Sequence, residues 1–122
     1  MSSSNELVVE KAVKNYQSGY NCAQTVLLTL FEQIEPNSKN ELIPKIAAGF
    51  AGGMGRCGSV CGALTGSLMA VGIKYGSNEA SAEKQAKAYA YANKLYKQFE
   101  KHQGTVYCRD LIKFDLSKHE EA

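Results

Sequence analysis

The chain has no tryptophan, only two prolines and four cysteines, and a net charge of just +2 over 122 residues. Such a small charge argues against nucleic-acid binding, because a phosphate-binding surface normally shows as a strongly basic domain or a concentrated basic stripe. Four cysteines are well below the density of a secreted disulfide scaffold. The apolar share of 44% and the charged share of 21% are typical of globular proteins and argue against disorder. The length predicts one helical domain over residues 1–122, with 118–122 as a frayed tail.

The first residues contain neither a basic segment nor an apolar run of the secretory type, so we expect a cytoplasmic location. In that reducing compartment, grouped cysteines more often bind metals or undergo redox chemistry than form structural bridges. The stretch 46–73 has a single charged residue, Arg56, and is long enough to cross a bilayer. Eight of the eleven glycines lie within it, which predicts an interrupting loop and no membrane span.

Apolar residues recur at helical spacing through nearly the whole chain, with no strict alternation and no Asn-Gly or Asp-Gly hairpin signal. This pattern predicts an all-α fold: a single compact bundle of about five helices plus a short C-terminal helix. The expected helices run from a Ser4 or Asn5 cap to about Ser18, from an Asn21 cap to before Pro36, over 42–50, over 60–75, from a Ser77 or Asn78 cap to about Gln103, and from about Tyr107. A Gly- and Cys-rich junction separates the third helix from the fourth.

The fourth expected helix carries two stripes with a four-residue spacing. One has almost no side chain and consists of Gly58, Gly62, Gly66 and Ala70. The other consists of Cys57, Cys61, Thr65 and Met69. Because small residues let another backbone approach closely, the first stripe predicts a tight helix contact with two thiols beside it.

Cys57 and Cys61 would share one face if their segment is helical. Their Cβ atoms would then be about 5 to 6 Å apart, whereas a relaxed disulfide needs roughly 3.5 to 4.5 Å. A bridge inside a regular helix would therefore be strained. Three alternatives follow: the glycines place Cys57 outside the helix, each thiol pairs elsewhere, or both ligate a metal.

Cys22 and Cys61 are expected at or near helix starts, where the amide dipoles favour a thiolate. Cys108 has Arg109 as its neighbour and a helix start close by. The spacing of the four cysteines alone is compatible with separate core cysteines, with a metal or cluster site, and with a dithiol redox function.

Several segments together resemble the family described as redox-active and named after its C_GCAxxG_C_C cysteine pattern. They are residues 20–24 (YNCAQ), 52–55 (GGMG) followed by Cys57, 61–66 (CGALTG) and 104–111 (GTVYCRDL). The resemblance covers roughly 16–115 and includes all four cysteines. It implies that Cys22, Cys57, Cys61 and Cys108 are the family's cysteines, without implying how they pair.

Members of that family resemble part of the split-Soret cytochromes and often occur near transporter genes. The resemblance therefore allows a transport-system protein as a partner. This chain has no Cys-x2-Cys-His motif, so it does not support covalent haem attachment.

Two other signals are weaker. Residues 53–58 match the G-x-G-x-x-G pattern, but they follow an expected helix and lack the strand of a dinucleotide site. Arg56 lies among glycines, where we expect an exposed arginine, although it could help hold an anion or a thiolate.

The fifth expected helix has two faces. One is predicted to be solvated and carries Lys84, Lys87, Lys94, Lys97 and Lys101. The opposite face is predicted to lie in the core and carries Ala82, Ala86, Tyr89, Tyr96 and Phe99.

The leading hypothesis is a small redox protein in which four cysteines meet at the glycine-rich junction and perform dithiol-disulfide exchange or electron transfer with a redox partner. It needs no cofactor. The candidate site consists of Cys22, Cys57, Cys61 and Cys108, supported by Gly53, Gly55, Arg56, Gly58, Gly62 and Gly66. One alternative uses the four cysteines as ligands of zinc or an iron-sulfur cluster. Another is a non-catalytic helical module, for instance a homodimer, that acts with a transport system.

Overall fold

The computed structural model describes residues 2–112, and in this range the all-α prediction is confirmed. The elements are α1 (Ser2–Gln17), α2 (Cys22–Ile34), α3 (Leu42–Ala47), the 3-10 helix η1 (Ala48–Phe50), α4 (Gly62–Tyr75), α5 (Ala82–Gln103) and α6 (Cys108–Ile112). The expected tail over 118–122 lies outside the described residues.

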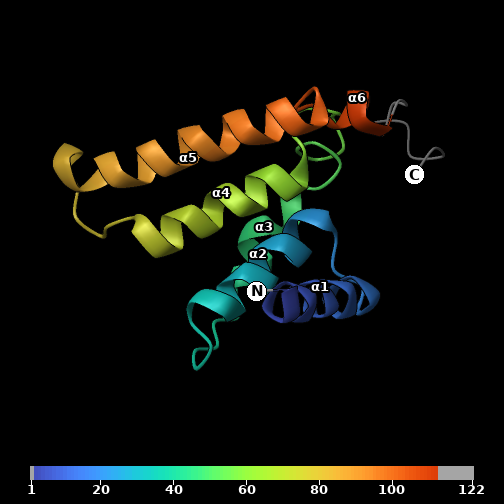
Figure 1. Ribbon diagram of the computed structural model, residues 1–122, viewed down its shortest axis with the longest axis horizontal. Coiled ribbons are helices and arrows are strands. Elements are labelled where there is room, and N and C mark those ends of the chain that lie inside the picture. The colour runs from blue at the N-terminus through green and yellow to red at the C-terminus, as the bar shows by residue number, and fades with distance from the viewer. Residues whose placement is uncertain (1, 113–122) are drawn as a thin grey trace.

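Helix α2 is the centre of the fold. It packs against α1, α3 and α4, while α5 packs along the other side of α4 (Figure 1). Its buried apolar residues Ala23, Leu27 and Phe31 recur every four positions, so they form one stripe. Ile43 and Ala47 of α3 and Ala70 of α4 complete this core cluster. The molecule is thus a stack of helices with α1 at one edge and α5 at the other.

The start of α2 has a reciprocal cap. The Asn21 side chain accepts a hydrogen bond from the Gln24 amide at 2.9 Å, and the Asn21 amide donates to the Gln24 side chain at 3.0 Å. The side-chain amides of Asn21 and Gln24 also donate to the carbonyls of Ala48 and Pro44. This arrangement satisfies two backbone amides at the helix start, those of Asn21 and Gln24, and ties the beginning of α2, where Cys22 lies, to α3 and η1.

The predicted seam of small residues is confirmed for α4. A carbon added to Gly66 would lie 2.8 Å from the Ala23 carbonyl oxygen, so only glycine lets α2 approach this closely. Ala70 is also buried. The prediction is wrong for Gly58, which lies in the loop before α4 and faces the Arg109 side chain instead.

Several helix starts differ from expectation. Helix α4 begins at Gly62 because Val60 forms an antiparallel bridge with Tyr107. Helix α5 begins at Ala82 because the Ser81 hydroxyl caps it by accepting from the Lys84 amide, whereas the Ser77 hydroxyl accepts from Glu79 in a local turn. Helix α1 begins earlier than predicted, at Ser2.

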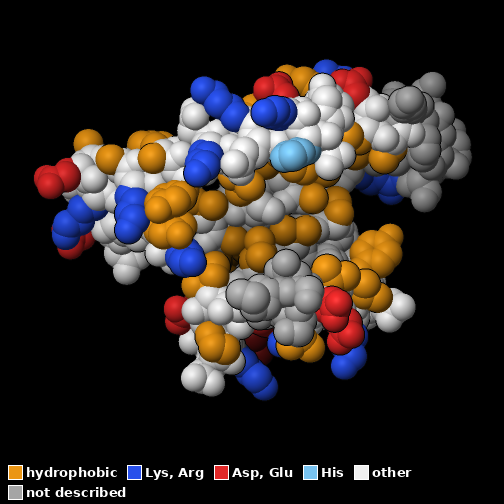
Figure 2. Space-filling model, viewed as in Figure 1, with side chains coloured by type: hydrophobic (Ala, Val, Ile, Leu, Met, Phe, Trp, Pro, Cys, Tyr) orange, Lys and Arg blue, Asp and Glu red, His pale blue; other side chains and the backbone are white. Residues whose placement is uncertain are grey.

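Helix α5 has no fully buried residue, since it covers only one side of α4. Its lysines are exposed as predicted, and Lys and Arg side chains are scattered along this edge of the molecule (Figure 2). The expected core face is only partly correct. Tyr96 and Phe99 are half-buried, but Tyr89 is 69% exposed, and Ala82 and Ala86 are exposed as well. No helix within the described range is both long and apolar enough to span a membrane.

Candidate functional site: a cluster of thiols at the glycine-rich junction

The junction between η1 and α4 is an ordered loop in an unusual backbone conformation. Five consecutive residues, 52–56, have positive φ angles between 61° and 73°, and Met54 and Arg56 are among them. Residues with a side chain disfavour this left-handed region, so the loop depends on its glycines. Backbone hydrogen bonds from Gly58 to Gly52 and from Ser59 to Gly53, at 3.0 and 2.9 Å, close the loop. The chain therefore reaches Cys57 before any helix has begun.

Cys61 and Cys108 are held by backbone pairing between two segments that are distant in sequence. The Cys61 amide donates to the Val106 carbonyl at 2.8 Å, and the Cys108 amide donates to the Ser59 carbonyl at 2.7 Å. These bonds flank the Val60–Tyr107 bridge. We call this pairing the clasp. It fixes the start of α4 beside the start of α6, and hence Cys61 beside Cys108.

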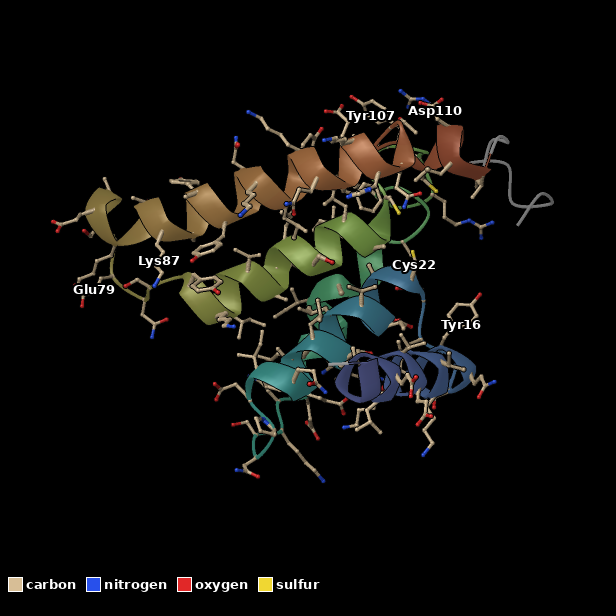
Figure 3. All side chains as sticks on the ribbon, in the orientation of Figure 1. Tyr16, Cys22, Glu79, Lys87, Tyr107 and Asp110 are labelled. Atoms are coloured by element: carbon tan, nitrogen blue, oxygen red, sulfur yellow. The ribbon has the colours of Figure 1, made fainter. Side chains whose placement is uncertain are left out.

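Cys22 reaches the same place from α2. It is the first residue of that helix, and a carbon added to Gly62 would lie 2.5 Å from its Sγ atom. Gly62 directly follows Cys61, so the Cys22 sulfur lies next to the beginning of α4. Figure 3 shows Cys22 at the end of α2 that faces the junction.

The Cys108 thiol is affected by its surroundings. Burial, and then the neighbouring Cys61 and Cys22 thiols, raise the pKa of the Cys108 thiol above its ordinary value. Cys108 is buried, with 8% of its surface exposed, whereas Cys22 and Cys61 are half-buried. We refer to Cys22, Cys61 and Cys108 as the three-thiol cluster. All of its members are free thiols.

Cys57 differs from the expectation that all four cysteines meet. It lies in the loop, it is exposed, and its thiol makes only a long contact of 3.9 Å to the Gly55 carbonyl. It does not share a helical face with Cys61, because Cys61 precedes the first residue of α4. Of the alternatives drawn from the spacing, the structure selects the one in which the glycines place Cys57 outside the helix.

Arg56 is not the exposed arginine that the sequence predicted. Its side chain folds back over Gly52, and its Nη2 atom is buried without a hydrogen-bond partner. Arg109 approaches the other end of the loop, where its side chain donates to the Gly58 carbonyl at 3.3 Å. Glycines at 52 and 58 give room for these two side chains, since an added carbon at either position would meet them at less than 3.0 Å.

The metal-site alternative has a geometric requirement, namely several ligand atoms that converge on one point. Among residues 2–112, no group of three or more Cys, His, Asp and Glu side chains is arranged to hold a metal ion. The three thiols lie near one another, but they do not form a ready ligand set.

Comparison with known proteins adds one finding. The family profile described as "Putative redox-active protein (C_GCAxxG_C_C)" matches residues 20–122. The chain belongs to this C_GCAxxG_C_C family. No curated protein and no solved structure shows a significant match.

The C_GCAxxG_C_C match includes all four cysteines and begins after α1, so α1 lies outside the range that the profile covers. The family resemblance found in the sequence is thereby confirmed. The clasp was missed at that stage, because a single bridged pair such as Val60 and Tyr107 is too short to give an alternating pattern.

Proposed function

We propose that this protein performs dithiol-disulfide exchange and that the three-thiol cluster is its reactive centre. The observation that carries the proposal is the proximity of three thiols from three separate segments of the chain: the Cys22 sulfur lies against Gly62, and the clasp holds Cys61 beside Cys108. A redox dithiol needs a second thiol near the first, so that a mixed disulfide can be resolved within the molecule. Membership of the C_GCAxxG_C_C family supports redox chemistry of these cysteines.

In the proposed reaction, the Cys22 thiolate attacks one sulfur of a substrate disulfide. A Cys22 mixed disulfide forms, and one substrate thiolate leaves and takes up a proton. The Cys61 thiolate then attacks the Cys22 sulfur and releases the second substrate thiolate. The substrate gains two electrons and two protons and becomes two thiols, while the protein gains a Cys22–Cys61 disulfide.

Cys108 has a different role in this scheme. Because its raised pKa keeps the thiol protonated at neutral pH, Cys108 is a poor first nucleophile. It lies where it can exchange with a disulfide formed by its neighbours, which would move that disulfide into the interior. On the composition of the chain we also propose a cytoplasmic location, where a thiol reductant such as a cellular dithiol returns the centre to its reduced form.

The test is to treat reduced protein with one equivalent of a small disulfide and to map the product by peptide mass spectrometry after alkylation. We expect an intramolecular disulfide within the three-thiol cluster. Cys22→Ser and Cys61→Ser should each stop its formation at the mixed-disulfide stage or earlier. Cys57→Ser is the matched control, because Cys57 is the family cysteine outside the cluster, and it should still form the bond.

The proposal fails if Cys22→Ser and Cys61→Ser oxidise like the original protein. Native mass spectrometry of protein purified without oxygen tests the metal alternative on the same sample. A bound metal that is lost on denaturation, together with four free thiols, would favour a metal or iron-sulfur protein instead.

A further inference from the structure

A groove between α1 and α2 has Cys22 in its wall. The groove has a volume of about 500 Å³ and is lined by Ala12, Val13, Tyr16 and Gln17 of α1 and by Cys22, Thr25 and Val26 of α2. Small-molecule sites usually have volumes of about 300 to 1,000 Å³. The groove therefore has the size of a ligand site, and it contains a nucleophile.

The turn between α1 and α2 creates this groove. Helix α1 ends at Gln17, and Gly19 has a φ of 106°, which lets the chain reverse direction within a few residues. Tyr16 in the last turn of α1 then lies close to Cys22 at the start of α2, and Figure 3 shows both on the side where the chain turns. Farther along, the Asn15 side chain donates to the Thr29 hydroxyl at 3.0 Å and holds the two helices together.

The lining is apolar apart from four neutral polar groups, the Tyr16 hydroxyl, the Gln17 amide, the Thr25 hydroxyl and the thiol itself. The Thr25 hydroxyl donates to the Tyr20 carbonyl at 3.4 Å and is buried, so it offers little to a ligand. The charged side chains Glu10, Lys11 and Lys14 line the neighbouring groove of α1, which shares only Val13 with this one. An ionised ligand would lose hydration in the Cys22 groove without gaining an opposite charge.

Tyr16 is the feature that fits an organic ligand. Its side chain is 64% exposed although it is aromatic, and it borders a groove that leads to a thiol. A flat ring at such a position gives a large apolar contact area to a ligand beside it. Val13, which is 48% exposed, extends the apolar surface along α1.

We propose that this groove binds the uncharged, apolar substituent of a small disulfide and presents its sulfur to Cys22. The inference rests on the proposed function and adds to it the substrate class: neutral organic disulfides in preference to charged ones. The reaction is the exchange described above. The Cys22 thiolate forms a bond to one substrate sulfur, the substrate S–S bond breaks, and the leaving thiolate takes up a proton from water.

The experiment uses reduced full-length protein that carries Cys57→Ser and Cys61→Ser, so that the exposed loop thiol does not contribute and a mixed disulfide on Cys22 is not resolved by Cys61. The rate of exchange is measured with neutral dithiodipyridine and with dianionic dithiobis(nitrobenzoate), and peptide mapping identifies the labelled cysteine. We expect Tyr16→Ser to lower the rate with the neutral disulfide by roughly fivefold, because part of the apolar contact is lost. Tyr89→Ser is the matched control: it is an equally exposed helix tyrosine, on α5, and should change neither rate.

A charge introduced into the groove gives the readout that a purely structural effect would not produce. Gln17→Lys should raise the rate with the dianionic disulfide, relative to the rate with the neutral one, by about threefold to tenfold. Equal changes with both disulfides, or a label on Cys108 in place of Cys22, would overturn the groove proposal.

The two proposals fail separately. If the cluster disulfide forms normally but Tyr16→Ser and Gln17→Lys show no selectivity, the groove is not a substrate site and the redox function stands. If both variants show the expected selectivity but no disulfide forms within the cluster, the groove binds disulfides and the proposed dithiol reaction is wrong.

Discussion

The Sγ atom of Cys22 lies against Gly62, the first residue of α4, so closely that a carbon added to Gly62 would be 2.5 Å from the sulfur. The backbone amide of Ala23 would lie at 3.1 Å from the same carbon. The glycine thus sets both the distance between α2 and α4 and the place of the Cys22 thiol. The packing of α2 against α4 and the position of the Cys22 thiol therefore both depend on Gly62.

Gly62→Ala is therefore expected to lower the free energy of unfolding by about 1 to 3 kcal/mol, as overpacking at a tight contact does. It should also change the rate at which Cys22 is alkylated, since the sulfur must move. Gly72→Ala is the control within the same helix: nothing lies within 4 Å of an added carbon there, so it should stabilise the protein by about 0.5 to 1 kcal/mol. Denaturant unfolding of both variants checks the pair, and the same sign for both would contradict the close contact.

A pH dependence follows from Cys108. Its pKa is raised in the folded protein, so the folded state holds this proton more tightly than the unfolded state does. The resulting stability is fully present below the ordinary thiol pKa of about 8.5 and is lost as pH rises through the folded value. Unfolding free energies measured between neutral and alkaline pH should fall more steeply for the original protein than for Cys108→Ala. Parallel curves would show that Cys108 does not carry this effect.

The left-handed loop gives a pair of opposite predictions. Met54 has a φ of 63° and an exposed side chain, so Met54→Gly should stabilise the protein by about 1 kcal/mol by relieving the backbone. Gly55 has a φ of 61° and almost no neighbour, so Gly55→Ala should destabilise it by about 1 to 2 kcal/mol through the backbone alone. Thermal unfolding measures both. Stabilisation by Gly55→Ala would mean that the loop has a different conformation.

The cap of α2 predicts a local effect near the thiols. Asn21→Ala removes the acceptor for the Gln24 amide and should cost about 1 to 2 kcal/mol of stability. Asn21→Asp keeps that acceptor and loses only the donor to the Ala48 carbonyl, so it should cost less. Unfolding free energies and hydrogen exchange at the Gln24 amide distinguish the two variants. If Asn21→Asp costs as much as Asn21→Ala, the contact to Ala48 matters more than the cap.

Local signals made much of the fold predictable. Asn21 caps α2 and Gly104 ends α5 with a φ of 82°, because their chemistry acts within a few residues. The small residues of α4 likewise predicted a close neighbour, although not which helix it would be. Tyr89 was misplaced because the spacing on α5 does not reveal that, within residues 2–112, α5 packs mainly against α4 and leaves Tyr89 exposed.

The site was less predictable for a physical reason. Met54 and Arg56 adopt positive φ angles because of hydrogen bonds within the loop, and these bonds cannot be predicted from the residue types. The loop conformation keeps Cys57 outside α4. The proximity of Cys61 and Cys108 depends on pairing across the whole α4–α5 hairpin. Sequence spacing identified the four cysteines, and only the folded chain separates three of them from the fourth.

The clasp also gives the molecule an internal reporter. The amide groups of Cys61 and Cys108 are both donors in its hydrogen bonds, so their exchange with heavy water requires the two segments to separate. The exchange rate of these two amides measures how often the two segments of the clasp separate, and no reagent reacts with sulfur in the measurement. Backbone opening and thiol reactivity can thus be followed as independent signals at the same two residues.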